Sequence, residues 1–174
     1  MPLKFVYGSL MLHNKALRSG KAAYINDHEI CFNHIGISKW EPSFANIEKS
    51  EGNRAWGVLV DFQHEIWTEI KKDEFSYIEI NVIAIAMDEK RYRCTTLTLM
   101  EKFKDLEKPP SARYAKMLWE GAKYHRIPDA VLKKYEGYYR KGHKGTLWLG
   151  PVRFPIFWIA RLLIRLMVKS GKLG

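Results

Sequence analysis

The stretch Phe5-Val6-Tyr7-Gly8-Ser9-Leu10-Met11 decides how the chain begins to fold. Residues 3–7 alternate enough in polarity to predict a strand, and Gly8 and Ser9 end it because both are typical turn residues. The leucine and methionine that follow, together with Leu17, recur at a spacing that predicts a short helical segment. A strand, a tight loop and a helix start therefore open the chain.

Further strands are predicted where β-branched and aromatic residues gather. The segments are residues 29–39, 44–49, 55–62, 77–87 and 92–100. Two of the intervals carry turn residues, Ser50-Glu51-Gly52-Asn53 and Asp88-Glu89-Lys90. This pattern predicts an α+β protein built on a mixed, mostly antiparallel sheet or small barrel.

Three amphipathic helices are expected to flank these strands. Residues 63–74 place Ile66, Trp67 and Ile70 at helical spacing, with charged residues between them. A second helix is expected to begin at Pro109-Pro110-Ser111, where the serine can cap its first turn. A third follows Pro128, because apolar side chains recur after it on one face.

The charge of the chain divides it into two parts. Its 174 residues suit one domain, and 47% hydrophobic with 28% charged residues exclude a disordered or fibrous chain. The net charge is +10, yet the first 137 residues hold 21 basic and 19 acidic residues. The last 37 hold eight basic residues and no acidic ones. We therefore predict a near-neutral body over residues 1–137 and a basic tail over residues 138–174.

The tail has the pattern of a basic amphipathic helix. Its apolar run Ile156-Phe-Trp-Ile-Ala-Arg-Leu-Leu-Ile-Arg-Leu-Met-Val168 is about 20 Å long as a helix, too short for the ~30 Å hydrocarbon core. Arg161 and Arg165 share a face with Lys169 and Lys172. Such helices bind anionic membrane surfaces, which makes such a surface one expected partner. The alternative is a helix that packs on the body or on a second subunit, giving a homodimer. Nucleic acid is not an expected partner, because an apolar face has no role against phosphates.

Four motifs in the body carry a resemblance to a known family. They are Tyr7-Gly8-Ser9-Leu10 after the first strand; Ala45-Asn46-Ile47 followed by Trp56-Gly57-Val58-Leu59; Trp67-x-x-Ile70-x-x-x-Glu74 before Tyr77; and Pro109-Pro110-Ser111-x-x-Tyr114 through Gly121-Ala122 to Ile127-Pro128 and Leu132. Each motif alone is weak. Together, in this order and over about residues 3–138, they resemble the γ-glutamylcyclotransferase family.

The resemblance implies a small barrel with helices at its rim, a pocket at its mouth, and residues 1–137 as a catalytic domain. The implied enzyme lets the α-amino group of a γ-glutamyl amine or peptide attack its own γ-carbonyl. The products are 5-oxoproline and an amine or amino acid, and no cofactor or metal takes part. With two cysteines, Cys31 and Cys94, and no opening leader pattern, the expected compartment is the cytoplasm. The tail would add attachment to the inner membrane surface.

Glu74 is the expected catalytic residue, because it stands where the family has its glutamate. The substrate ammonium, with a pKa near ~8, must lose a proton before it can attack. A glutamate of ordinary pKa, about 4.3, makes that transfer uphill by about 5 kcal/mol. Partial burial beside Phe75 and Tyr77 is expected to raise the pKa of Glu74 and so to lower this free-energy cost. The protonated carboxyl can then donate its proton to the departing amine. The alternative interpretation is that Glu74 is a solvated residue in the charged run Lys71-Lys72-Asp73-Glu74. Within that run, Asp73 is the next candidate for the catalytic carboxylate.

Substrate binding is expected from the loop and from three tyrosines. In Tyr7-Gly8-Ser9-Leu10 the missing side chain of glycine lets backbone N–H groups approach the substrate α-carboxylate. Tyr7, Tyr77 and Tyr114 match family tyrosines, and phenols can hydrogen-bond a carboxylate or a developing oxyanion. Each tyrosine can equally be a core residue with one satisfied hydroxyl.

Other chemistries find little support in the sequence. None of the six histidines stands in a zinc-binding spacing, so no metal is expected. No nucleophile-elbow or P-loop motif occurs. The alternative function is a membrane- or partner-binding protein that keeps the fold without turnover, and such a protein would have no need of a carboxylate at position 74.

Overall fold

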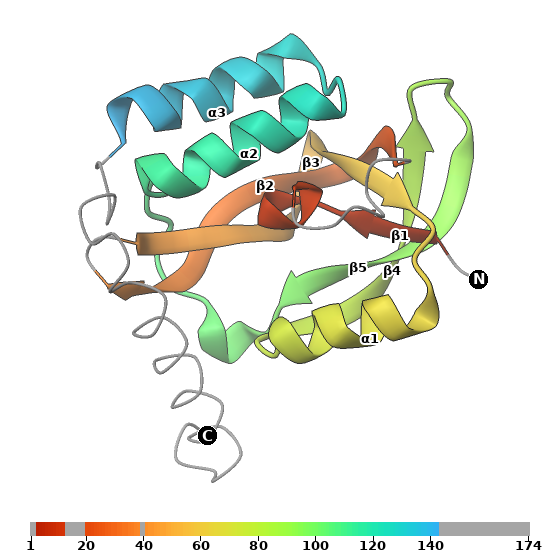
Figure 1. Cartoon of the computed structure of the whole chain (residues 1–174), viewed down its shortest axis with the longest axis horizontal. Coiled ribbons are helices and arrows are strands. Elements are labelled where there is room, and N and C mark those ends of the chain that lie inside the picture. The colour runs from red at the N-terminus through yellow and green to blue at the C-terminus, as the bar shows by residue number, and fades with distance from the viewer. Residues whose placement is uncertain (1–2, 13–19, 39–40, 143–174) are drawn as a thin grey trace, which may run out of the picture.

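The computed structural model describes residues 3–12, 20–38 and 41–142. The chain forms a β-barrel with helices on two sides (Figure 1). In chain order the elements are β1 (Leu3–Val6), the 3-10 helix η1 (Gly8–Met11), β2 (Lys21–Ser38), β3 (Glu41–Val60), α1 (His64–Asp73), β4 (Tyr77–Ala86), β5 (Arg91–Leu99), the 3-10 helix η3 (Glu101–Phe103), α2 (Ala112–Tyr124) and α3 (Asp129–Lys141).

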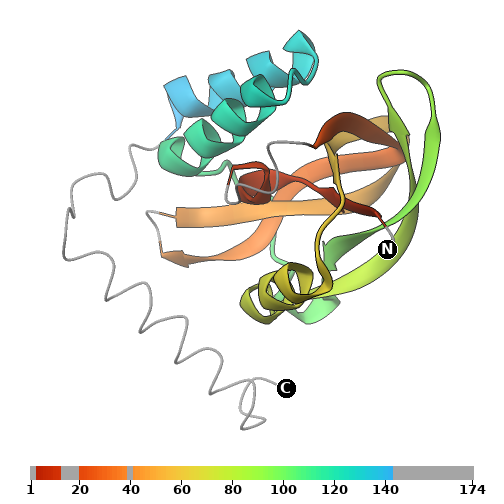
Figure 2. The ribbon, with the colours of Figure 1, turned by 45° about the vertical axis from the view of Figure 1, so that its right-hand side comes forward.

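The predicted small barrel is confirmed. The strands close in the order β1-β3-β2-β4-β5, and every pairing is antiparallel except β1 with β5. Closure between β2 and β4 is short, because only Ala23 with Ala86 and Tyr24 with Ile85 pair there. Helices α2 and α3 lie together on one side of the barrel and α1 lies on the other (Figure 2). The α+β architecture expected from the sequence is therefore the one observed.

One expectation about the strands is wrong. Residues 50–53 were expected to separate two strands, but β3 runs through them as one strand paired with β2. They form a bulge, because Asn26 pairs with Arg54 while His28 already pairs with Lys49. Gly52 (φ +76°) lies in the bulge and donates its N–H to the Asp27 carboxylate at 3.0 Å. The turn-forming residues at positions 50–53 therefore bend the strand instead of ending it.

The three predicted helices of the body are confirmed with nearly the expected bounds. Ser111 caps α2, since its hydroxyl accepts the backbone N–H of Tyr114 at 3.1 Å. On α3, Tyr135 is buried while Val131 and Leu132 pack against the core. In the described residues, no helix has the length and apolar character needed to cross a membrane.

Helix α3 crosses the boundary placed after Gly137. It continues to Lys141, and Tyr138 packs edge-on against the core residue Phe32, with ring centroids 5.3 Å apart. The folded body thus includes residues up to at least Gly142. The apolar run 156–168 and the basic residues up to Lys172, which predict the amphipathic helix of the tail, lie outside the described residues.

A polar network fastens α1, and hence the residues that follow it, to the barrel. Trp67 of α1 is 3% exposed and donates its indole N–H to Glu79 Oε1 at 2.9 Å. Lys4 of β1 bonds the same oxygen at 2.7 Å and lies over the Trp67 ring. Burial alone raises the pKa of Glu79, but hydrogen bonds from Lys4, Thr95, Lys71 and Trp67 outweigh it and lower the pKa to about 2.

This network predicts a specific acid sensitivity. A carboxylate with a depressed pKa stabilises the fold above its unfolded-state pKa, about 4.5, and loses that contribution as pH falls toward about 2. We expect Glu79→Gln to lower the unfolding midpoint at pH 7, and the gap to the wild type to close between pH 4.5 and 2. Thermal unfolding at several pH values measures this. Glu69→Gln, which removes only the exposed pair with Lys72, is the control and should change little. A gap that stays constant with pH would contradict this role of Glu79.

Candidate active site

The loop after β1 is tightly enclosed by other elements. Gly8 has φ +64°, a conformation that side chains with a Cβ rarely adopt. A Cβ placed on Gly8 would lie 3.2 Å from Tyr114 Oη and 3.3 Å from Ala45 Cβ. His125, just after α2, bonds the Met11 carbonyl at 3.2 Å. The described part of the predicted helix start is the single turn η1, and it is held against α2.

Tyr114 joins α2 to this loop. It lies in the first turn of α2, is 5% exposed, and its oxygen accepts the N–H of Ala45 at 3.3 Å. Burial raises the pKa of Tyr114 to about 12, and hydrogen bonds from Ala45 and Ser9 act in the opposite direction. Ser9 therefore lies against the Tyr114 hydroxyl, as a member of the same cluster.

Tyr7 and Tyr77 direct their hydroxyl groups at backbone carbonyls. Tyr7 donates to Leu97 O and Tyr77 donates to Ala45 O, each at 2.7 Å. Burial raises the pKa of both phenols well above the usual value. Each O–H proton is thus engaged by the protein, so what these two hydroxyls can offer a ligand is an oxygen lone pair.

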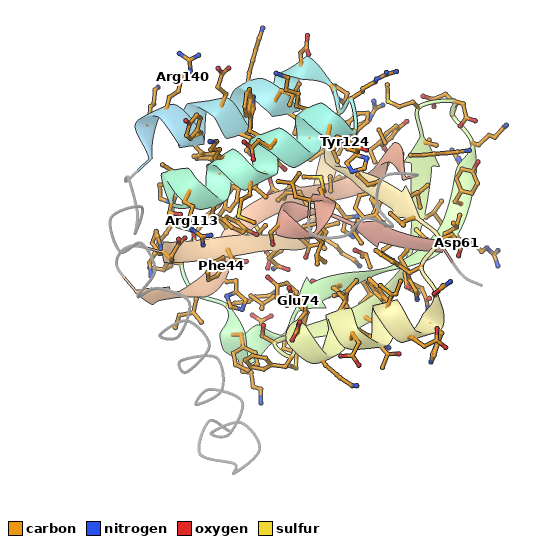
Figure 3. The ribbon with its side chains drawn as sticks, in the orientation of Figure 1. Phe44, Asp61, Glu74, Arg113, Tyr124 and Arg140 are labelled. Atoms are coloured by element: carbon orange, nitrogen blue, oxygen red, sulfur yellow. The ribbon has the colours of Figure 1, made fainter. Side chains whose placement is uncertain are left out.

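Glu74 occupies the turn that follows α1. Its N–H donates to Ile70 O at 2.8 Å, and its carbonyl accepts the N–H of Tyr77 at 2.9 Å, where β4 begins. The side chain is half-buried and lies at the C-terminal end of α1 (Figure 3). The charge of Glu74 contributes to raising the pKa of Tyr7, Tyr77 and Tyr114. The structure thus gathers the predicted acid and the three predicted tyrosines from four parts of the chain.

Two other residues considered at the sequence level lie less centrally. Leu10 is half-buried and packs against the hydrophobic core. Asp73, the rival of Glu74, is the exposed last residue of α1. The charge of Glu74, by contrast, raises the pKa of all three tyrosines.

Sequence reasoning missed the residues that line the cluster on its β2 and β3 side. Phe44 packs edge-on against Tyr114, with ring centroids 5.2 Å apart. His34 stacks on Tyr77 at 5.5 Å and 11°, and its Nε2 lies 2.9 Å from Ser76 Oγ. Neither belongs to a recognisable motif, because a lone histidine in a strand carries no signal of its own. Only the Ala45 that follows Phe44 lay in a motif.

Two other features bear on where ligands could bind. A cavity of about 110 Å³ lies between β2, β3 and α3, lined by Glu29, Arg54, Trp56 and Lys134 among others. It contains none of the predicted site residues, so we distinguish it from the cluster around Glu74. Across the described ranges, no three His, Cys, Asp or Glu side chains gather as around a metal ion.

Comparison with known proteins agrees with the fold of the chain. No family model matches the chain. It is 27% identical over 158 residues to the "Gamma-glutamylcyclotransferase" of Bos taurus and 24% identical to that of Mus musculus; each match covers 83% of this chain and 82% of the relative. A solved structure named "Gamma-glutamyl cyclotransferase" superposes with a TM-score of 0.66 at 24% identity, covering 78% of this chain and 86% of that chain.

Proposed function

Since this chain is a relative of the γ-glutamylcyclotransferases in sequence and in fold, we propose that it cyclises γ-glutamyl amines or peptides to 5-oxoproline. The observation that carries the proposal is the cluster itself. The charge of one half-buried carboxylate, Glu74, acts on two buried tyrosines, Tyr7 and Tyr114, and on the partly buried Tyr77, beside a loop in which a side chain on Gly8 would crowd Tyr114 and Ala45.

The proposed reaction is a single intramolecular acyl transfer. The substrate α-amino nitrogen attacks the γ-carbonyl carbon, the lactam C–N bond forms, and the C–N bond to the leaving amine breaks. Holding the amine and carbonyl near contact replaces a bimolecular encounter, for which effective-molarity terms of about 7–11 kcal/mol are available. Glu74 takes one proton from the ammonium before attack and gives it to the departing nitrogen. The carboxylate so restored then takes the second proton that the attacking nitrogen must lose to become the lactam N–H, and passes it to the released amine, which leaves as an ammonium. The protons of the reaction therefore balance without a cofactor.

The neighbouring groups have distinct proposed roles in holding the glutamyl end. Backbone N–H groups at Gly8, Ser9 and Leu10 bind the α-carboxylate, which the tight glycine turn allows to approach. Tyr7 and Tyr77, whose protons already serve carbonyls, offer lone pairs to the α-ammonium. Tyr114, whose oxygen accepts hydrogen bonds, donates to the oxyanion that develops on the γ-carbonyl.

A panel of γ-glutamyl compounds tests the proposal. The full chain is incubated with γ-glutamyl amino acids, γ-glutamyl-ε-lysine and γ-glutamyl amines, and 5-oxoproline is quantified. We expect 5-oxoproline from at least one class, without added cofactor and equally in the presence of EDTA. Release of glutamate in place of 5-oxoproline would identify a hydrolase and contradict the proposal.

For location, we propose a cytoplasmic protein that also binds anionic membrane surfaces through the basic amphipathic segment of its tail, residues 156–172. The two cysteines, Cys31 and Cys94, are free and buried in the body, which agrees with a reducing compartment. Basic residues near a charged surface contribute about 1 kcal/mol each.

The membrane proposal predicts a separable effect of two arginines. Replacing Arg161 and Arg165 by Glu in the full chain should weaken binding to vesicles containing phosphatidylserine by at least about tenfold. Formation of 5-oxoproline in solution should stay unchanged, and higher salt should weaken wild-type binding. A co-sedimentation assay measures this, with neutral vesicles as the control. Equal binding of both proteins to anionic vesicles would contradict the proposal.

A further inference from the structure

His34 of β2 lies against the turn that carries Glu74, and its hydrogen bonds define its protonation. Nδ1 is 2.8 Å from the Ile35 carbonyl, which can only accept, so Nδ1 carries a hydrogen. Burial lowers the pKa of His34, partly offset by that backbone hydrogen bond, and the ring is neutral at pH 7. Nε2 therefore has a free lone pair, and it accepts the hydroxyl proton of Ser76 at 2.9 Å.

Ser76 is the buried residue in the middle of this turn. The N–H of Tyr77 bonds the Glu74 carbonyl, which closes a tight turn over residues 74–77. The Ser76 carbonyl accepts the N–H of Met100 at 3.0 Å, so the end of β5 holds the backbone of the turn. His34 of β2 holds its side chain. Ser76 is thus fixed between two strands that lie far apart in the sequence.

The His34 ring also links this turn to the rest of the cluster. It is nearly parallel to Tyr77, with centroids 5.5 Å apart and an interplanar angle of 11°. It also contacts Phe44 edge-on, with ring centroids 5.6 Å apart, and Phe44 in turn packs against Tyr114. Movement of the imidazole would therefore displace Ser76 and Tyr77 together.

We propose that His34 is a positioning residue for the cyclisation: it acts through Ser76 to fix the turn at Glu74, and so places the carboxylate for proton transfer. The inference rests on the proposed function. A misplacement of about 1 Å in a reacting group costs on the order of 10²-fold in rate. Since the Ser76 contact acts on the turn that carries the base, losing that contact while the stacking on Tyr77 is kept should lower kcat and leave KM nearly unchanged.

The experiment compares variants that separate the two contacts of the ring. His34→Phe keeps the stacking on Tyr77 but cannot accept from Ser76, whereas His34→Gln keeps an acceptor and loses the ring. Ser76→Ala removes the donor, and it tests the same contact if His34→Phe fails to fold. His28→Phe, on the same strand with its ring on the Asn26 carbonyl, is the matched control.

For each variant, kcat and KM are measured on the best γ-glutamyl substrate, and amide hydrogen exchange is measured at Tyr77. We expect His34→Phe and Ser76→Ala each to lower kcat about 10- to 100-fold. The double variant should fall no further than either single one, because both remove the same contact. His34→Gln should recover part of the rate. Tyr77 amide exchange should quicken about tenfold in His34→Phe and stay unchanged in His28→Phe.

The outcomes separate this inference from the function on which it rests. Wild-type kcat and wild-type Tyr77 exchange in His34→Phe would overturn the positioning role, as would fully additive losses in the double variant. A wild-type chain that forms no 5-oxoproline would instead overturn the proposed function. In that case the exchange of Tyr77 alone still decides whether His34 holds the turn.

Discussion

Glu74→Gln is expected to lower turnover by about 10²–10⁴-fold, the range for loss of an acid–base group. Glutamine keeps the size and shape of the side chain but cannot take a proton from the substrate ammonium. The fold should persist, because the backbone bonds of Glu74 to Ile70 and Tyr77 do not involve its carboxylate. Initial rates of 5-oxoproline formation measure the loss, and thermal unfolding checks the fold.

Asp73→Asn is the matched control for this result. Asp73 precedes Glu74 directly, carries the same charge and is exposed at the end of α1. Its replacement should change turnover by less than about twofold, because solvent and salt screen the effect of an exposed charge on the reacting groups. A Glu74→Gln variant that turns over at the wild-type rate, or an Asp73→Asn variant that loses activity instead, would show that the base is assigned to the wrong carboxylate.

Gly8→Val is expected to raise KM by about tenfold or more before it abolishes folding. The positive φ of Gly8 disfavours any β-branched residue, with a strain of about 1–2 kcal/mol. The new Cβ would also press on Tyr114 and Ala45, which lie 3.2 and 3.3 Å from its position. Both effects distort the loop proposed to bind the α-carboxylate. Steady-state kinetics and an unfolding midpoint on the same preparation measure the two consequences.

Gly52→Val provides the comparison that isolates the site. Gly52 also has a positive φ, +76°, but a Cβ there meets nothing within 4 Å. Its replacement carries the backbone strain without crowding Tyr114, so stability should fall while KM stays at the wild-type value. If Gly8→Val and Gly52→Val affect KM equally, the loop at Gly8 does not hold the substrate.

The strands and helices were predictable where local pattern and tertiary structure agree. The helix capped by Ser111 and the strands after Glu74 carry strong periodic signals, and they form almost as expected. Residues 21–28 were not predicted as strand, because Asn26, Asp27 and His28 favour a turn locally. They are strand because Ala22 and Ala23 pair with Val58 and Gly57, and a bulge absorbs the turn-forming residues.

The candidate site was predictable in membership more than in the role of each group. Family order pointed to Glu74 and the three tyrosines, and the structure brings them together. That Tyr7 and Tyr77 direct their protons at carbonyls depends on strands distant in sequence, so no local pattern contains it. The contact of His34 with Ser76 likewise spans 42 positions, so it too lies beyond any local pattern.

In the proposed mechanism, the substrate amine attacks its own γ-carbonyl with no water in the acyl transfer. The most direct measurement is turnover of one γ-glutamyl substrate by the full chain in H₂¹⁸O, followed by mass spectrometry of the products. This mechanism predicts one unlabelled 5-oxoproline for each amine released. Glutamate carrying ¹⁸O, or 5-oxoproline labelled with ¹⁸O, would show that water attacks the carbonyl first and would contradict it.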